Sequence, residues 1–235
     1  MERVLGGIGG CMGNTELLEE YDSIQAEMMA ESCIMVDSSD TILGAVSKYS
    51  AHRDQGVLHR AFSVLMFNDE NKLLIQRRSD QKITFPGVWA NSCCSHPLSV
   101  EGENTTGDAH GVGNAAIRKL SQELGIDTKS FVSEDFNLIG RFEYSSKAEQ
   151  GWIEHELDYV IGIHSNVLLN PNINEISDYK WLSKEELFDF CSDESNIIAP
   201  WFIAIIKLYL TNWWPKNSND YPKYDLLIPD MGELS

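Results

Sequence analysis

Basic residues are scarce in this chain, and their scarcity excludes one large class of partners. Among 235 residues there are 18 Lys or Arg against 36 Asp or Glu, so the net charge is −18 when the histidines are neutral. Proteins that bind nucleic acid neutralise its phosphates with a surplus of Lys and Arg. The sequence therefore predicts no nucleic-acid partner, and any anionic ligand has to be met by a local group of cations.

Long apolar runs and paired cysteine motifs are missing too. No segment approaches the roughly 20 apolar residues of a membrane span, and residues 1–14 lack the apolar stretch of a secretory signal. The five cysteines form an odd set without C-x-x-C spacing, which disfavours a disulfide framework. We expect no membrane span, reduced thiols and, by default, a cytoplasmic location, because the ending Glu233-Leu234-Ser235 is not a peroxisomal signal.

The composition itself is that of an ordinary globular protein. Hydrophobic residues make up 43% of the chain and aromatic residues 10%, enough for one sizeable core. We predict a mobile acidic N-terminal arm over residues 1–22 and a single domain over residues 23–235. Internal repeats and heptads are absent, and we expect a monomer.

Hydrophobic patterning predicts strands that bracket a central helix, with further helices near the end of the chain. The expected strands are 33–37, 42–46, 61–67, 72–78, 138–144 and 154–164, with the first two forming one hairpin and the next two the clearest hairpin. The expected helices are 23–32, 114–124, 183–190 and 200–213, and 102–113 is a polar loop. This order predicts an α/β layered domain with a mixed sheet.

The segment from Ala90 to Pro97 is the most informative part of the chain, because it places a thiol and an imidazole two residues apart. In an extended segment, residues i and i+2 project to the same face. Cys94 and His96 are therefore expected to line one pocket while Cys93 faces away. The few cations near this segment, Lys48, Arg77, Arg78 and Lys82, are candidates for meeting an anionic ligand.

Histidines and glutamates elsewhere in the sequence indicate a metal site. Glu154 and Glu156 share one strand face, whereas His155 points to the other side. Together with His52 and His59, such groups suit a divalent metal such as Zn²⁺, Mn²⁺ or Mg²⁺. Each pattern alone is more typical of a solvated surface, so spacing by itself leaves both interpretations open.

Taken together and in order, these segments resemble type I isopentenyl diphosphate isomerase, a Nudix-related family. The resemblance extends from about Cys33 to Trp213, and Cys94-Ser95-His96-Pro97 is most similar to the eukaryotic form. The matching pieces are Lys48 to His52, Leu58 to Ser63, Gln76 to Arg78, Phe85 to Pro97, Ala116 to Gly125, Trp152 to Glu156, and Pro200-Trp201. The resemblance implies a Nudix-like α/β/α layered domain with a mixed sheet.

The resemblance also implies a reaction. An isomerase of this family, in isoprenoid biosynthesis, interconverts isopentenyl and dimethylallyl diphosphate through a tertiary carbocation, by protonating the alkene and removing a proton from the adjacent carbon. Cys94 and Glu156 match the two catalytic residues, and we expect the thiol to face Glu156 across the pocket. Tyr144 matches a tyrosine that assists proton delivery, and Trp201 a tryptophan whose π face suits a cation.

Ligand-binding residues are carried over in the same way. By the resemblance, one divalent metal (Mg²⁺, Mn²⁺ or Zn²⁺) is held by His52, His59, His96, Glu154 and Glu156. The diphosphate is met by Lys48, Arg78, Lys82 and Ser95, and a further ion, Mg²⁺, bridges it to Glu123. The native metal, and which of the two catalytic groups is the acid, stay open.

The Nudix hydrolase signature, G-x5-E-x7-R-E-U-x-E-E-x-G-U, survives only in part. Anchored on Arg118 and Gly125, it retains Glu123 and Ile126, but non-acidic residues stand at its other glutamates: Lys119, Gln122 and His110, with Asn104 at the first glycine. The missing carboxylates would hold the metals that activate water, so hydrolysis looks disabled. Two alternatives remain: a Nudix diphosphohydrolase, and a catalytically inactive domain that holds a metal structurally.

Overall fold

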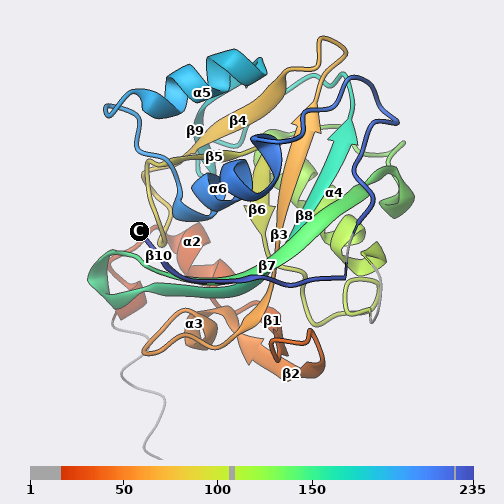
Figure 1. Cartoon of the computed structure of the whole chain (residues 1–235). Coiled ribbons are helices and arrows are strands. Elements are labelled where there is room, and N and C mark those ends of the chain that lie inside the picture. Colours follow the sequence, from red (N-terminus) through yellow and green to blue (C-terminus); the bar gives the residue numbers. More distant parts are fainter. Residues whose placement is uncertain (1–16, 106–108, 225) are drawn as a thin grey trace, which may run out of the picture.

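One mixed β-sheet organises the protein, seen in a computed structural model that describes residues 17–105, 109–224 and 226–235 (Figure 1). Its strands are β1 (Ser32–Val36), β2 (Ile42–Ser47), β3 (His59–Phe67), β4 (Leu73–Arg78), β5 (Trp89–Asn91), β6 (Cys93–Ser95), β7 (Asn137–Lys147), β8 (Ile153–His164), β9 (Ile176–Leu182) and β10 (Asp230–Leu234). The main order is β10-β7-β8-β3-β1-β2. In addition, β6 pairs with β3, and β4 pairs with β9, β5 and the end of β3.

Helices cover both faces of this sheet. They are α2 (Ser23–Met28), α3 (Lys48–Ala51), α4 (His110–Leu124), α5 (Lys184–Ser192) and α6 (Pro200–Ile205), which continues as a π-helical turn over Ile206–Leu210. The helix α4 lies on one face, and α5 and α6 lie on the other (Figure 1). The predicted α/β/α layering with a mixed sheet is therefore confirmed. None of the helices within the described ranges is long and apolar enough to cross a membrane.

The centre of the sheet is the parallel pair β3 and β8. All nine residues of β3 are buried, and they pair in register from His59 with Glu156 to Phe67 with His164. Strands covered on both faces read as nearly continuous apolar runs. Alternation sends Val64 and Met66 into the core beneath α4, and Leu65 and Phe67 into the core beneath α6.

Several element predictions are confirmed. The β1–β2 hairpin forms, α5 begins with the capping box of Ser183 and Glu186, and α4 ends at Gly125, which adopts a left-handed φ of 62°. However, α4 begins at His110 rather than at residue 114, so the predicted loop of residues 102–113 is shorter than expected.

The prediction that residues 61–67 and 72–78 pair as a hairpin is wrong beyond the turn that connects them. Strands β3 and β4 pair only at Phe67 and Leu73, after which β4 turns away and pairs with β9 from Leu73–Leu182 to Arg78–Ile176. The physical reason is that both edges of β3 are already taken, by β8 and by β6. The strands β9 and β10 carry mainly exposed residues, which is why the hydrophobic pattern missed them.

The predicted N-terminal arm falls into two parts. Residues 1–16 lie outside the described residues. Residues 17–22 differ from the prediction of a mobile arm, because Leu17, Leu18 and Tyr21 pack in a small cluster around the buried Trp152. The indole Nε1 of Trp152 donates a hydrogen bond of 2.8 Å to the hydroxyl of Tyr21.

A buried carboxylate in the β1–β2 turn ties that hairpin to the sheet. The Asp40 side chain is 6% exposed and lies 2.6 Å from Nε of Arg60 and 2.8 Å from Nη1 of Arg141. It also accepts a hydrogen bond from the hydroxyl of Tyr159. One turn residue thus contacts β3, β7 and β8, so its charge is fully compensated in the interior.

We expect Asp40→Asn to lower the free energy of unfolding by about 3 kcal/mol, because it leaves the buried guanidinium of Arg60 and the partly buried one of Arg141 without their counter-charge. Asn tolerates the positive φ of 66° at this position, so the change isolates the charge. The matched control is Asp54→Asn, at an exposed aspartate with a φ of 60°. Urea unfolding monitored by circular dichroism measures both; equal stability of the two variants would contradict the prediction.

Candidate active site

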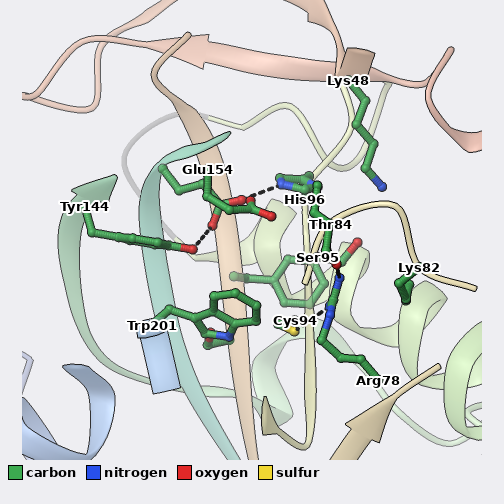
Figure 2. A pocket seen from close by; sticks show the side chains of 13 residues that line it. Lys48, Arg78, Lys82, Thr84, Cys94, Ser95, His96, Tyr144, Glu154 and Trp201 are labelled. Atoms are coloured by element: carbon green, nitrogen blue, oxygen red, sulfur yellow. Dashed lines mark hydrogen bonds and ion pairs between the residues drawn. The ribbon is translucent and has the colours of Figure 1, made fainter. Parts of the chain in front are cut away.

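A pocket opens where the ends of β3, β6 and β8 meet the loop of residues 79–88 (Figure 2). It contains about 440 Å³ of space not filled by atoms, counted out to its mouth. The predicted site residues that line it are Lys48, Arg78, Lys82, Cys94, Ser95, His96, Tyr144, Glu154, Glu156 and Trp201. Phe62, Ser63 and Thr84 also line it and were not predicted.

The two sides of the pocket differ in chemistry. Figure 2 shows Lys48, Arg78 and Lys82 on one side, with Tyr144 and Trp201 on the other. Cations suit an anionic group, whereas aromatic walls suit an apolar body. The pocket is therefore built for a small molecule that has an anionic end and an apolar end.

Cys94 reaches the pocket because β6 is a true strand. Its residues pair antiparallel with β3, Cys94 opposite Ser63, so alternate side chains face opposite sides of the sheet. Cys93 faces the core, where its Sγ lies 3.6 Å from Oε2 of Glu123. The predicted division between the two neighbouring cysteines is confirmed.

The Cys94 thiol stays protonated at neutral pH. Burial raises its pKa to about 12, although the charge of Arg78, whose Nη1 lies 3.6 Å from Sγ, works in the opposite direction. A neutral thiol is a poor nucleophile but retains a proton to give. The site is therefore equipped for proton transfer at sulfur rather than for nucleophilic attack by it.

Three imidazoles converge on one carboxylate oxygen. The Nε2 atoms of His52, His59 and His96 lie 3.9, 3.7 and 2.7 Å from Oε1 of Glu156. His52 comes from the C-cap of α3, His59 from the start of β3 and His96 from the residue after β6. Residues far apart in the sequence thus meet at one point.

The orientation of these rings fits a metal ion. The Nδ1 atoms of His52 and His59 lie 2.8 and 2.7 Å from the carbonyl oxygens of Lys48 and Val57, and must donate because carbonyls only accept. Each Nε2 atom can therefore offer a lone pair when its ring is neutral; that of His52 faces Glu154 and Glu156, and that of His59 is buried without a hydrogen-bond partner. Such converging lone pairs call for a cation.

The predicted five-residue metal set is only partly brought together. Ligand atoms of His52, His59, His96 and Glu156 lie within 4.8 Å of one another, so these residues could hold one ion. Glu154 lies beside them, with its Oε2 3.2 Å from Nε2 of His52. The carboxylate of Glu154 therefore supports His52 directly.

Burial and the neighbouring charges set the protonation of the histidines. Burial and the charge of His52 lower the pKa of His59 to about 3, and burial holds the pKa of His96 well below its usual value. Burial also opposes the charge on His52, but the carboxylate of Glu154 outweighs it and raises the pKa of His52 to about 9. Without a metal, His52 therefore carries a second ring proton and a positive charge at neutral pH, whereas His59 and His96 are neutral.

Glu156 contacts the histidine cluster through one carboxylate oxygen and Tyr144 through the other. Opposite it on β7, the Tyr144 hydroxyl donates a hydrogen bond of 2.6 Å to Oε2. Burial opposes ionisation of Glu156, but hydrogen bonds from its neighbours, first among them His52, lower its pKa. Burial, reinforced by Glu156, holds the pKa of Tyr144 well above its usual value. Glu156 is thus a carboxylate, ready to accept a proton.

Trp201 is oriented by a residue that the sequence interpretation missed. Its Nε1 donates to Oδ1 of Asn91 at 3.2 Å, and Nδ2 of Asn91 donates to the carbonyl of Cys93 at 2.8 Å. Asn91 is fully buried and therefore positions both the indole and β6. An asparagine inside an otherwise buried segment was the available signal, because a buried amide requires hydrogen-bond partners.

The cationic wall is held by the loop of residues 79–88. Arg78 donates from Nε to the carbonyl of Phe85 at 2.9 Å and from Nη2 to that of Thr84 at 2.7 Å. Lys82 forms an ion pair with Glu175, and the ammonium of Lys48 lies 4.0 Å from Glu31. Arg77, in contrast, binds the carbonyl of Gly87 and does not line the pocket.

Glu123 lies behind the pocket wall rather than in it. Its Oε1 is 2.9 Å from Nζ of Lys119 and 3.9 Å from Nζ of Lys82. Burial works to raise its pKa, but Lys119 and Lys82 lower the pKa to about 2. At another signature position, Gln122 contacts the sulfur of Met28 at 3.4 Å. The α4 surface thus carries an ammonium where a hydrolase signature has a carboxylate.

Comparisons with known proteins agree with this geometry. The NUDIX domain family matches residues 57–202. The isopentenyl-diphosphate Delta-isomerase 1 of Bos taurus is 45% identical over 203 residues, which cover 83% of this chain and 89% of that protein. The isopentenyl-diphosphate delta-isomerase of Schizosaccharomyces pombe is 41% identical over 92% of this chain and 98% of its own length. A solved structure from Deinococcus radiodurans shares the fold, with a TM-score of 0.56 and 19% identity over 76% of this chain and 99% of that chain.

Metal binding to the histidine cluster should release a proton, because His52 has a pKa of about 9 and must lose its proton before it binds. The affinity for Zn²⁺ or Mn²⁺ should therefore rise with pH, by about tenfold per unit between pH 6 and 8, and level off above pH 9. Isothermal titration in buffers of different ionisation enthalpy measures the released proton.

The matched control for this experiment is His155→Ala, since His155 lies on the opposite face of β8 and contacts Gly56 instead. This variant should bind metal normally, whereas His59→Ala should lose at least about tenfold in affinity. An affinity independent of pH, or equal losses in both variants, would contradict the assignment.

Proposed function

The chain belongs to the isopentenyl-diphosphate delta-isomerases, within the NUDIX family, and we propose that it carries out its reaction between Cys94 and Glu156. The enzyme interconverts isopentenyl and dimethylallyl diphosphate in isoprenoid biosynthesis. One observation carries the proposal: a single pocket holds a protonated thiol and an ionised carboxylate, with cations on one side and aromatic rings on the other.

The reaction needs both an acid and a base, because an unactivated alkene is a poor base and the resulting cation must lose a different proton. In one direction, the Cys94 thiol gives its proton to the terminal alkene carbon, which leaves the cation on the substituted alkene carbon, and the Glu156 carboxylate removes a proton from the CH₂ group on the other side of that cation. The thiolate that forms is beside Arg78. The reverse reaction exchanges the two roles, and no covalent intermediate with sulfur is required.

Tyr144 and Trp201 support this transfer. The Tyr144 hydroxyl already donates to Glu156, so it stabilises the carboxylate and can relay its proton. The indole of Trp201 offers a π face without a nucleophilic atom, which stabilises a tertiary carbocation without trapping it. Both residues are at most 3% exposed, so they form a fixed wall of the pocket.

The diphosphate takes the cationic side of the pocket. We propose that Lys48, Arg78, Lys82 and Ser95 bind it, which supplies the local positive charge that a protein of net charge −18 lacks elsewhere. By the family resemblance, Glu123 would hold the Mg²⁺ that accompanies the diphosphate, and because it lies behind the pocket wall its carboxylate would have to exchange Lys119 and Lys82 for the ion. The low pKa of Glu123 supports this role, because a hard cation prefers an ionised oxygen ligand.

A further divalent metal belongs to the histidine cluster. His52, His59, His96 and Glu156 are the proposed ligands, and Glu154 completes the set. Mg²⁺, Mn²⁺ and Zn²⁺ are the candidates; three imidazoles favour Zn²⁺ over Mg²⁺. When bound, such an ion withdraws charge from Glu156 and thereby tunes its acidity.

The competing functions fit the pocket less well. A NUDIX diphosphohydrolase would need carboxylates on α4 where Lys119 and Gln122 stand. An inactive domain with a structural metal gives no reason to keep a protonated thiol and an indole beside the metal ligands. The isomerase reaction therefore accounts for more of the pocket than either alternative.

We also propose that the enzyme is a cytoplasmic monomer. The cysteines within the described residues (Cys33, Cys93, Cys94 and Cys191) are free thiols, which supports a reducing compartment.

Incubation of the protein with isopentenyl diphosphate and Mg²⁺ in D₂O should yield dimethylallyl diphosphate that carries deuterium, detected by NMR. Cys94→Ala should lower kcat by roughly 10³-fold, because it removes one of the two proton-transfer groups. Cys93→Ala is the matched control and should keep the wild-type rate, since Cys93 faces the core. Release of inorganic phosphate without deuterium uptake would favour the hydrolase instead.

Replacement of Trp201 in the aromatic wall should lower kcat. Trp201→Leu should lower kcat by about 30-fold, the equivalent of about 2 kcal/mol of cation–π stabilisation, while Trp201→Phe, which retains a π face, should lose less. Steady-state kinetics with isopentenyl diphosphate measure both variants, and near-UV circular dichroism checks that they fold. Equal kcat values for Leu and Phe would show that the ring face does not contribute.

A further inference from the structure

A buried carboxylate behind the pocket wall, Glu175, has no part in the reaction described above. It precedes β9 and is 1% exposed. Its Oε2 forms an ion pair with the Lys82 ammonium, and its Oε1 accepts a hydrogen bond of 3.2 Å from Nε2 of Gln25. A charged group so deeply buried is costly unless it is paired, so its placement beside a pocket lysine is informative.

The backbone around Glu175 connects the elements that frame the diphosphate side. The amide of Ser79 donates to the carbonyl of Glu175 at 2.9 Å, where the loop carrying Lys82 begins. The amide of Asn172 donates to the carbonyl of Glu123 at 2.9 Å. The segment before β9 is thus anchored to the substrate loop on one side and to the end of α4 on the other.

Lys82 lies between two carboxylates. Besides Glu175, its Nζ lies 3.9 Å from Oε1 of Glu123, which in turn pairs with Lys119. The Lys82 side chain is 11% exposed and that of Glu175 is 1% exposed. A lysine is a point charge on a flexible stem, so its rotamer freedom must be lost when it binds a ligand unless the protein has already fixed it.

The helix α2 closes this arrangement from outside. The Gln25 amide donates to Glu175 and also to Oδ1 of Asn174 at 2.7 Å. Gln25 is itself buried, and α2 is fixed at its start by the side chain of Asp22, which accepts from the amides of Ile24 and Gln25. The carboxylate of Glu175 is therefore held in one orientation from two directions.

We propose that Glu175 is a positioning residue for the substrate: it holds the Lys82 ammonium at the pocket, where the diphosphate binds. This inference rests on the proposed role of Lys82. Removal of the carboxylate frees the lysine stem and leaves Glu123, 3.9 Å from Nζ, as its remaining counter-charge, so the ammonium is no longer fixed before the diphosphate binds. The diphosphate does not change during the reaction, so ground state and transition state weaken alike, and KM rises while kcat is kept.

The first test compares Glu175→Gln with Glu27→Gln, an exposed glutamate on α2 that serves as the matched control. Glu175→Gln should raise KM for isopentenyl diphosphate, and Kd for inorganic pyrophosphate, by about five- to tenfold with kcat within twofold of wild type. The control should change neither constant. An unchanged or lowered KM in Glu175→Gln would overturn the proposal.

A double-mutant cycle separates positioning from a general structural effect. Lys82→Met should raise KM by itself, and Glu175→Gln added to Lys82→Met should raise it no further, because Glu175 acts through the lysine. If Glu175→Gln raised KM by the same factor in the wild-type protein and in Lys82→Met, the proposal would be overturned. If Lys82→Met leaves KM unchanged, the proposed binding role of Lys82 fails as well, whereas failure of the cycle alone leaves that role and the reaction intact.

A milder variant covers the case in which Glu175→Gln does not fold. Gln25→Ala keeps both charges but removes the amide that orients Glu175. It should raise KM by about two- to threefold, again with kcat kept and again without effect in the Lys82→Met background. A change in kcat with an unchanged KM would contradict positioning.

Discussion

The parallel pairing of β3 with β8 is the contact on which the site depends. It places His59 opposite Glu156 at the end where both strands begin, and from there alternation carries Glu154 and Glu156 to the same face. If β8 were shifted by one residue relative to β3, both carboxylates would turn to the other side of the sheet and His155 would take their place. That shift is opposed by the continuous burial of β3, whose apolar side chains fill the cores on both faces. Catalytic geometry and core packing are therefore set by the same register.

Burial also gives the site its protonation states. The same loss of water raises the pKa of the Cys94 thiol and lowers that of His59, while specific partners overcome it at Glu156 and at His52. The result is a protonated thiol, an ionised carboxylate and an imidazole cluster in which His52 carries the charge, all within one pocket of a strongly acidic protein. Its cations are individually held, Arg78 by backbone carbonyls and Lys82 by buried carboxylates.

The fold alone does not determine this chemistry. The hydrolase signature, aligned on Arg118 and Gly125, has glutamates on the helix that is α4 here, yet this helix carries Lys119 paired with Glu123. The residues that we propose for catalysis lie instead on β6, β7 and β8 and at the start of α6. Function on a shared fold is decided by such local substitutions.

Sequence alone was sufficient for the local features. Alternation within Cys93-Cys94-Ser95 separated the two thiols, the two-residue spacing of Glu154 and Glu156 put them on one face, and the family resemblance named the pocket residues. Only the tertiary structure decided how distant segments meet. It shows that β4 leaves β3 to pair with β9 and that Glu123 lies near Lys82. It also shows that Asn91 accepts a hydrogen bond from Trp201 and that Glu175 pairs with Lys82. The physical reason is that alternation is a property of a single strand, whereas strand partners and buried ion pairs depend on contacts between residues far apart in the sequence, such as Lys82 with Glu175, separated by 93.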